Sequence, residues 1–334
     1  MVARSVRVAE ALAIGLLGIA AVSCGGVIAG SPQVVAAGQP VYGQPVSELD
    51  RAELAVAARA RAIAACGVLD RNVAATFGEL TAYGPVGDLS TCHAELIPPG
   101  GAPAAPAWVE VVVGEHLPPE RTGVARAEGG VEVRPALDAL PGTCTLYFAL
   151  PSDAERAPAR WGHVSYLDGS GGVGDSGGGD DCAEAWTVVR SAATRLNSAP
   201  PDSAKIPLMQ QDPCRTVERL RERGVESFAP GSRPFECLIT LRGGQEAAVR
   251  FGLSPEPPQT GGAEEVMLGG NAFRHFQDAR ECHYYFYPGD VLDANLPSSP
   301  VNEREKYGNR VTASVEASAP DCDDARTLVL TSSE

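Results

Sequence analysis

Residues 144–148 read CTLYF, and residues 282–286 read CHYYF. In each segment a cysteine opens a run in which every second side chain is apolar or aromatic, as in a β-strand that buries one face. By this count Cys144 shares a face with Leu146 and Phe148, so its sulfur is directed into the core. The two segments predict that the same kind of strand, with its cysteine directed inward, occurs twice in the chain.

The cysteines around these segments repeat as well. The intervals between consecutive cysteines are 26, 52 and 38 residues in one set of four and 23, 45 and 40 in the next. Two tandem copies of one domain explain this pattern. We therefore predict domains at residues 47–197 and 208–334, joined by a linker at 198–207. The two sets are Cys66, Cys92, Cys144 and Cys182, then Cys214, Cys237, Cys282 and Cys322.

Each copy shows the same order of predicted elements. A short helix ended by glycine begins at the first cysteine, two hairpins of alternating strands follow, and a helix starts at an Asp-Cys pair. Residues 47–65 add a helix before the first cysteine, with Ser47 as its cap. The expected fold class is α+β, with an antiparallel sheet and packed helices in each copy. The expected segments are 66–78, 108–113, 163–167 and 182–196 in copy one, and 214–224, 247–253, 309–316 and 322 onward in copy two.

In a chain that lies outside the reducing cytosol, these eight cysteines are most simply explained by four disulfides. Inward strand cysteines and cysteines at helix starts favour pairing the first with the second and the third with the fourth in each copy. Two other pairings within each copy remain open. The closest cysteines, Cys214 and Cys237, are 23 residues apart. Zinc knuckles need much closer pairs, so no metal site is predicted.

The amino terminus has the features of an export signal. Basic residues precede an uncharged apolar run at 11–22, which is too short to span a bilayer, and residues 1–23 are predicted to be a signal peptide. Residues 21–24, AVSC, resemble the lipobox of bacterial lipoproteins, in which the cysteine thiol receives a diacylglyceryl group whose acyl chains can be palmitate. That family prefers Leu at the position of Ala21 and Ala or Ser at that of Val22. Cys24 is the expected lipid anchor, residues 24–46 a flexible tether, and simple secretion is the alternative.

The cysteine order behind a lipobox resembles a family of actinobacterial envelope lipoproteins of unknown function. It is also similar to the external sensor domain of some actinobacterial Ser/Thr kinases. In the lipoprotein family the first cysteine usually follows Asp-Pro, as in the DPC of residues 212–214, whereas copy one has AAC at 64–66. The resemblance implies antiparallel sheets with packed helices and a role at the cell envelope, and it supplies no catalytic residues.

Charge excludes one class of partner. The chain has 27 basic and 42 acidic residues, a formal net charge of -15. Such a surface repels phosphate backbones, so nucleic acid is not an expected partner. The expected partners are the membrane, through Cys24, and an envelope ligand or protein.

Candidates for catalysis do not assemble into a set. Residues 174–178, GDSGG, match the segment around the nucleophile of chymotrypsin-like proteases, which would make Ser176 a nucleophile. The earliest histidine is His93, whereas that family places its base well over a hundred residues before the serine. The aspartates at 168–181 do not fit an EF-hand, because glycine occupies the twelfth position. His93 and His283 each follow a cysteine on a strand, so they are expected to point away from the core and to be ordinary surface residues.

The best binding candidate is the aromatic run at 284–287. Alternation places Tyr284 and Phe286 in the core and leaves Tyr285 and Tyr287 for a surface patch suited to a glycan, peptide or protein. The sequence thus favours an exported, lipid-anchored, non-enzymatic binding module without a cofactor. The alternatives are a secreted hydrolase using Ser176 and a structural envelope spacer.

Overall fold

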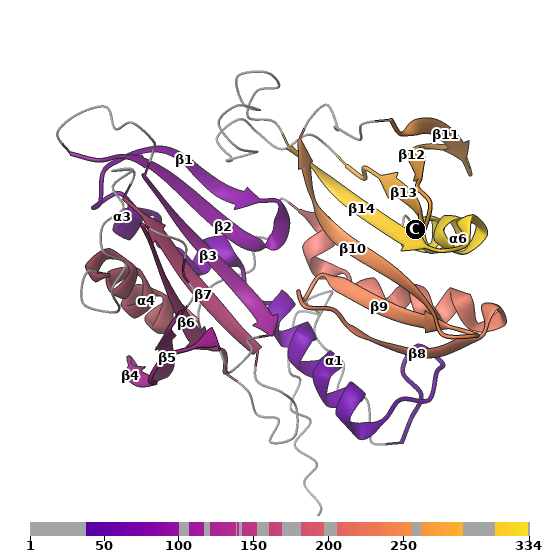
Figure 1. The fold of residues 1–334 in the computed structure, drawn as a ribbon, viewed down its shortest axis with the longest axis horizontal. Helices are drawn as coiled ribbons and strands as arrows, with labels where there is room; N and C mark the ends of the chain where they lie inside the picture. Colours follow the sequence, from indigo (N-terminus) through magenta and orange to yellow (C-terminus); the bar gives the residue numbers. More distant parts are fainter. Residues whose placement is uncertain are drawn as a thin grey trace, which may run out of the picture.

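The computed structural model describes residues 38–99, 107–116, 121–137, 139, 142–151, 160–168, 182–196, 206–255, 262–289 and 311–332. These residues form fourteen strands and a few helices, in two halves of seven antiparallel strands each (Figure 1). Cys24 and Ser176 lie outside the described residues, as do the aspartates at 175–181 and residues 198–205 of the predicted linker.

The first sheet has the strand order β1-β2-β3-β7-β6-β5-β4, and the second has the order β8-β9-β10-β14-β13-β12-β11. Each strand of the first half therefore has a counterpart seven numbers later. The first-half bounds are β1 Glu79–Val86, β2 Asp88–Ile97, β3 Ala107–His116, β4 Arg126–Glu128, β5 Val131–Pro135, β6 Thr143–Ala149 and β7 Arg160–Leu167. The second-half bounds are β8 Val225–Pro230, β9 Glu236–Leu241, β10 Gln245–Pro255, β11 Glu264–Leu268, β12 Asn271–Gln277, β13 Cys282–Phe286 and β14 Val311–Ala319.

Strand register agrees with the repeat. Cys92 on β2 lies opposite Val111 on β3, and Cys237 on β9 lies opposite Val249 on β10. On the other hairpin, Cys144 and Cys282 lie opposite residues of β7 and β14, respectively. Because register assigns every side chain to a face, these pairings define which positions of the two halves are equivalent.

Among the described residues there are also five α-helices and two 3-10 helices. Their bounds are α1 Glu48–Arg61, α2 Ala65–Val68, α3 Arg71–Ala74, α4 Ala183–Arg195, η2 Pro207–Gln210, η3 Pro213–Arg223 and α6 Cys322–Ser332. Ser47 caps α1, with Asp50 completing a capping box, as the sequence predicted for Ser47. Within the described part of the chain, no helix is both long and apolar enough to cross a membrane.

The predicted helix over 66–78 is wrong as a single element. It is split into α2 and α3, because Leu69 is extended and fully buried, and Asp70 then caps a new helix through the amide of Asn72. The counterpart η3 is continuous and ends just before Gly224, whose φ of 77° provides the turn.

Four disulfides join Cys66 to Cys92, Cys144 to Cys182, Cys214 to Cys237 and Cys282 to Cys322. This is the preferred connectivity predicted from the sequence. Each sheet is thus bridged twice to its own helices, once at η3 or α2 and once at α4 or α6. Four disulfides indicate an oxidising, extracytoplasmic environment.

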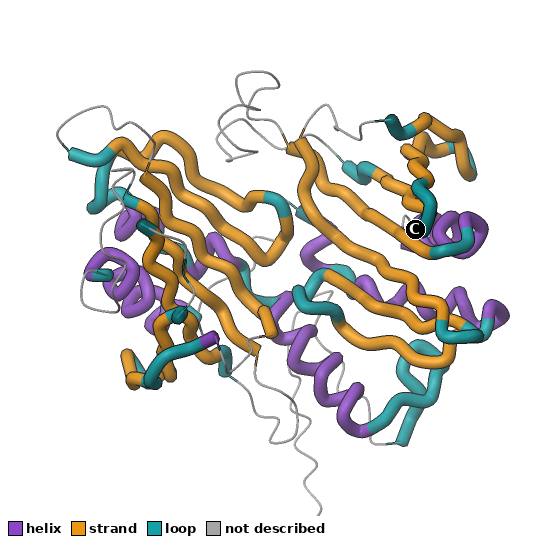
Figure 2. Tube along the Cα trace, in the orientation of Figure 1, coloured by secondary structure: helices purple, strands orange, loops and turns teal. Residues whose placement is uncertain are grey.

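The helices pack on one face of each sheet (Figure 2), and each half has its own apolar core. Helix α1 contributes to both cores, since Leu54 packs into the second and Ala60 into the first. Part of the predicted tether is also ordered. Val41 is buried against the second core, and the hydroxyl of Tyr42 donates to Asp212 at 2.8 Å. Helix α1 and the segment before it therefore connect the halves.

The two sheets meet at one backbone contact. Gly252 of β10 pairs with Asp88 at the start of β2, and the amide of Leu253 donates to the carbonyl of Gly87 at 2.9 Å. A Cβ at position 252 would lie 3.0 Å from that carbonyl oxygen, a tight contact, so the close approach favours a glycine. The fourteen strands consequently form one continuous sheet.

Candidate functional site

The outer face, meaning the sheet face opposite the two cores, carries the ionisable side chains. Alternation directs Cys92, Val164 and Cys237 into the cores and their strand neighbours outward. His163 of β7 and Glu316 of β14 occupy equivalent outer positions, opposite Val112 of β3 and Arg250 of β10. Each is the centre of a polar network, and the two central residues have opposite charge.

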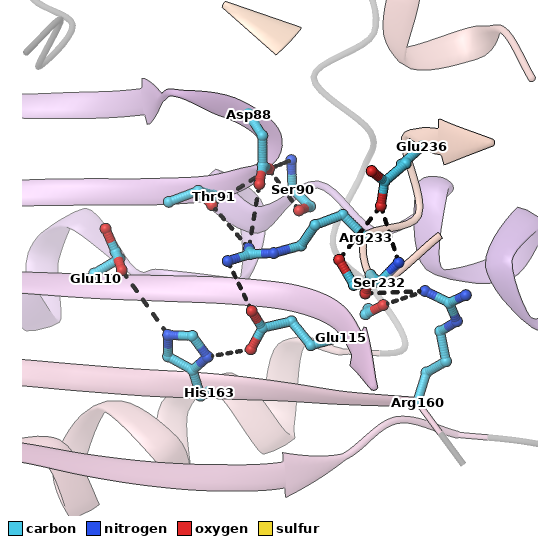
Figure 3. A network of polar contacts seen from close by, with 11 residues as sticks. Asp88, Ser90, Thr91, Glu110, Glu115, Arg160, His163, Ser232, Arg233 and Glu236 are labelled. Atoms are coloured by element: carbon cyan, nitrogen blue, oxygen red, sulfur yellow. Dashed lines mark hydrogen bonds and ion pairs between the residues drawn. The ribbon is translucent and has the colours of Figure 1, made fainter. Parts of the chain in front are cut away.

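The first network surrounds His163 (Figure 3). Its Nδ1 is 2.5 Å from a carboxylate oxygen of Glu115, and its Nε2 is 3.9 Å from Glu110. His93, stacked on Trp108, places Nδ1 3.6 Å from the other oxygen of Glu110. The side chains of both histidines are about one-seventh exposed. His93 therefore points away from the core, as predicted, but it is enclosed by neighbouring side chains and is not an ordinary surface residue. Strand pairing, which brings β2 and β7 to either side of β3, encloses it.

A second-half arginine completes this network. Arg233, in the turn between β8 and β9, donates to Glu115 at 2.7 Å and lies 3.2 Å from Asp88 (Figure 3). The same two carboxylates belong to strands of the first half. The network therefore links the halves beside the contact at Gly252.

Electrostatics fix the charge states in this network. Burial lowers the pKa of His163, but hydrogen bonds and charges from Glu110 and Glu115 outweigh it and raise the pKa to about 9. Burial raises the pKa of Glu110, but hydrogen bonds to His163 and His93 lower it to about 2. The pKa of Glu115 is lowered by His163 in the same way. At neutral pH, His163 is a cation held between two carboxylates.

This arrangement predicts how stability depends on pH. Because the pKa of His163 is raised, its contribution to stability is complete below about pH 6.5 and is lost as pH rises through 9. Because the pKa of Glu110 is lowered, its contribution to stability is complete above about pH 4.5. The difference in unfolding free energy between the wild type and His163→Gln should therefore shrink by on the order of 2 kcal/mol from pH 6 to above 9. Urea unfolding at a series of pH values measures it. A difference that is constant with pH would contradict the assignment.

The second network surrounds Glu316. Its carboxylate lies 3.3 Å from Nδ1 of His283, 3.5 Å from the hydroxyl of Tyr285 and 3.9 Å from Arg250. Arg250 also donates to Glu236 at 2.6 Å. Burial, and then the charge of Glu316, raises the pKa of Tyr285 to about 12, so its hydroxyl stays a donor. His283, like His93, points away from the core as predicted, but it is enclosed in a network and is not an ordinary surface residue.

Three rings follow one another beside this network. The ring centroids of Phe276 and His283 are 6.1 Å apart, and those of His283 and Tyr285 are 6.3 Å apart with nearly parallel planes. The rings come from β12 and β13, which are neighbouring strands. They form an aromatic wall along the outer face of the second sheet.

The wall borders an open depression of about 500 Å³ at the junction of the halves. Its floor is low because Gly252, Ser254 and Ser314 have small side chains on neighbouring strands. The predicted patch residues Tyr285 and Tyr287 both line it and are half-buried. The remaining lining residues are Gly87, Asp88, Arg250, Phe251, Leu253, Phe276 and Glu316.

Sequence reasoning missed most of this site. Asp88, Arg250 and Glu316 lie on three separate strands, and no local spacing connects them. The sequence does not show which carboxylates accompany the histidines, because those carboxylates lie on adjacent strands. The aromatic run gave the one signal that could be read from the chain.

One further group has donor atoms close together. Within the described residues, the donor atoms of His275, Cys282 and Cys322 all lie within 4.8 Å of one another. Both sulfurs are joined in a disulfide, so neither is a thiolate that binds a metal.

Comparisons with known proteins place the chain in no family. No family model matches it, and no curated protein matches it. Among solved structures it is matched to the di-domain ARO/CYC StfQ from the steffimycin biosynthetic pathway, with 10% identity over 81% of this chain and 94% of that chain and a TM-score of 0.16. A score at that level supports no conclusion about fold or function, so the site must be interpreted from its own chemistry.

Proposed function

We propose that this chain is a lipid-anchored envelope protein, tethered through Cys24. Its depression on the second sheet would bind an extracytoplasmic ligand without catalysing a reaction. The observation that carries the proposal is the depression itself, where an aromatic wall, small floor residues and paired charges meet. The resemblance to actinobacterial envelope lipoproteins and kinase sensor domains supports the location. The disulfides support an extracytoplasmic setting.

The lining favours a carbohydrate as the ligand. A sugar ring offers an apolar C–H face and a rim of hydroxyls. The rings of Phe276 and Tyr285 supply apolar surface, while Asp88 and Glu316 accept hydrogen bonds and Arg250 donates them. The serines of the floor add two hydroxyls. An open, partly polar hollow of this kind suits one or two sugar units of a longer chain better than an enclosed apolar molecule.

Tyr285 offers a matched test, because Tyr147 occupies the equivalent position on β6 and is not part of the lining. An array of neutral, amino and acidic oligosaccharides should identify a bound sugar, and calorimetry should then measure its affinity. Tyr285→Ala is expected to weaken binding about tenfold or more, since a central aromatic contact is typically worth more than 1 kcal/mol. Tyr147→Ala should bind like the wild type.

Two results would overturn this assignment. One is a wild-type chain that binds no oligosaccharide on the array, which would favour the structural spacer. The other is labelling by a serine-reactive fluorophosphonate that disappears in Ser176→Ala, which would favour the hydrolase. Equal losses in Tyr285→Ala and Tyr147→Ala would place the sugar elsewhere.

The anchor has its own test. Cells of an actinobacterial host that are fed an alkyne-tagged palmitate should label the wild-type chain and leave Cys24→Ala unlabelled. The same variant should move from the membrane pellet to the culture medium, because one apolar anchor is lost. Label that survives in Cys24→Ala would refute the anchor at this residue. An unlabelled wild type in the medium would support simple secretion.

A further inference from the structure

We propose that the disulfide Cys282–Cys322 is a thiol-exchange site, in which His275 stabilises the Cys282 thiolate released when the bond is opened. His275 lies on β12, and its Nε2 is 3.0 Å from the sulfur of Cys282 and 3.9 Å from that of Cys322. Its ring packs against Tyr284 at a centroid distance of 4.7 Å, which holds it beside the disulfide. The inference is independent of the ligand proposed above.

The first half provides the comparison. His275 pairs with Tyr284, two residues after Cys282, while Pro135 pairs with Leu146, two residues after Cys144. Pro135 is thus the counterpart of His275. Proline has no side-chain group that donates a hydrogen bond or carries charge. Equivalent disulfides in one chain therefore differ in whether a histidine accompanies them.

The histidine matters because thiol exchange releases a thiolate. A leaving sulfur departs faster when its negative charge is stabilised, and a neighbouring imidazolium is one of the groups that do so. Cys282 is completely buried, where an unpartnered thiolate would be unfavourable. His275 is positioned to offset that cost at the buried sulfur.

The reductant in this exchange is an external dithiol. Its thiolate attacks the sulfur of Cys322, the less buried of the two, and forms a mixed disulfide there. The electron pair of the original S–S bond leaves on Cys282, which accepts a hydrogen bond or proton from His275. The second thiol of the reagent, as a thiolate, then attacks the reagent sulfur that is bonded to Cys322. This step releases the Cys322 thiolate, which is protonated by water. One disulfide is reduced, and one dithiol is oxidised to a cyclic disulfide.

Accessibility alone predicts the opposite order of reduction. Cys144 and Cys182 are both half-buried, whereas Cys282 is fully buried. If exposure governed the reaction, Cys144–Cys182 would open first. If His275 acts as proposed, Cys282–Cys322 opens first despite its burial.

The experiment treats the folded, oxidised chain with dithiothreitol at neutral pH, traps free thiols with N-ethylmaleimide at intervals, and quantifies each cysteine by peptide mass spectrometry. Cys282–Cys322 should be reduced about tenfold faster than Cys144–Cys182. His275→Gln keeps a side chain of similar reach but cannot carry a positive charge, and it should remove that advantage without changing the rate at Cys144–Cys182. His116→Gln, at the exposed end of β3, is the control and should behave like the wild type.

The order of reduction in the wild type decides the matter even if a variant folds poorly. Opening of Cys144–Cys182 first in the wild type would overturn the proposal. An unchanged rate at Cys282–Cys322 in a folded His275→Gln chain would overturn it as well.

Discussion

Arg160→Ala is expected to lower the free energy of unfolding by about 3 to 5 kcal/mol, because it leaves buried carbonyls without a donor and creates a cavity. Arg160 is 1% exposed at the start of β7. Its guanidinium donates to the carbonyl of Gly114 at 2.7 Å in its own half and to that of Gly231 at 3.0 Å in the other. Burial lowers the pKa of Arg160 to about 10, and Glu53 partly counters that effect.

The size of the effect follows from what alanine would leave behind. Two backbone carbonyls would lose a charged donor, and a buried unpaired carbonyl costs about 1 to 3 kcal/mol. The space once filled by this large, fully buried side chain would add a cavity. Because Arg160 contacts both halves, the variant should also loosen their association (Figure 3).

Urea unfolding of the oxidised chain, followed by circular dichroism, measures this prediction. Arg134→Ala is the matched control, since that arginine is a third exposed and pairs with Glu132 on its own strand. It should cost at most about 1 kcal/mol. If the free energy of unfolding of Arg160→Ala lies within about 1 kcal/mol of the wild-type value, the hydrogen bonds of this side chain do not stabilise the junction.

Removing the disulfide Cys214–Cys237 by a double change to alanine should cost about 3 kcal/mol, because the bridge closes a loop of 23 residues. Both cysteines are almost completely buried in the second core, so two small cavities add to the loss. The bridge also holds η3 against β9, and the second half should therefore melt first.

The same unfolding experiment tests this change, with Cys24→Ala as the control that leaves all four disulfides intact. The double variant should show an earlier transition, whereas Cys24→Ala should superimpose on the wild type. A double variant with an unchanged transition would mean that packing around η3, and not the bridge, stabilises this half.

The cysteine pattern predicted much of the local structure. Alternation placed Leu146 and Phe148 on the core face of their strand, and both are buried. The Asp-Cys segments begin α4 and the helix α6, as expected. These features depend on periodicity and on residues close together in sequence, which is the information a single chain carries most directly.

The outer edges of the sheets were not predicted. Strands β4, β5, β11 and β12 are short segments in which few residues are buried, so their alternation is weak. Strands β1 and β8 are edge strands beside the predicted hairpins. An edge strand is stabilised by its neighbour more than by its own composition, and sequence patterns do not show it well.

The structure shows what the aspartate of the Asp-Pro-Cys segment does in copy two. Asp212, from the Asp-Pro-Cys segment, accepts hydrogen bonds from the amide of Cys214 and from Tyr42, and it forms an ion pair with Arg61 of α1. Copy one has Ala64 at the corresponding place.

By itself the sequence determined the number of copies, the faces of the main strands and the cysteines available for pairing, because each is set by spacing along the chain. Only the tertiary structure decided that His163 is enclosed by two carboxylates, that Gly252 meets Asp88 across the halves, and that Tyr285 and Tyr287 line a depression. Those neighbours come from strands far apart in sequence, and their contacts depend on strand order and register. A period of two tells which way a side chain points, and only the pairing of strands tells what it meets.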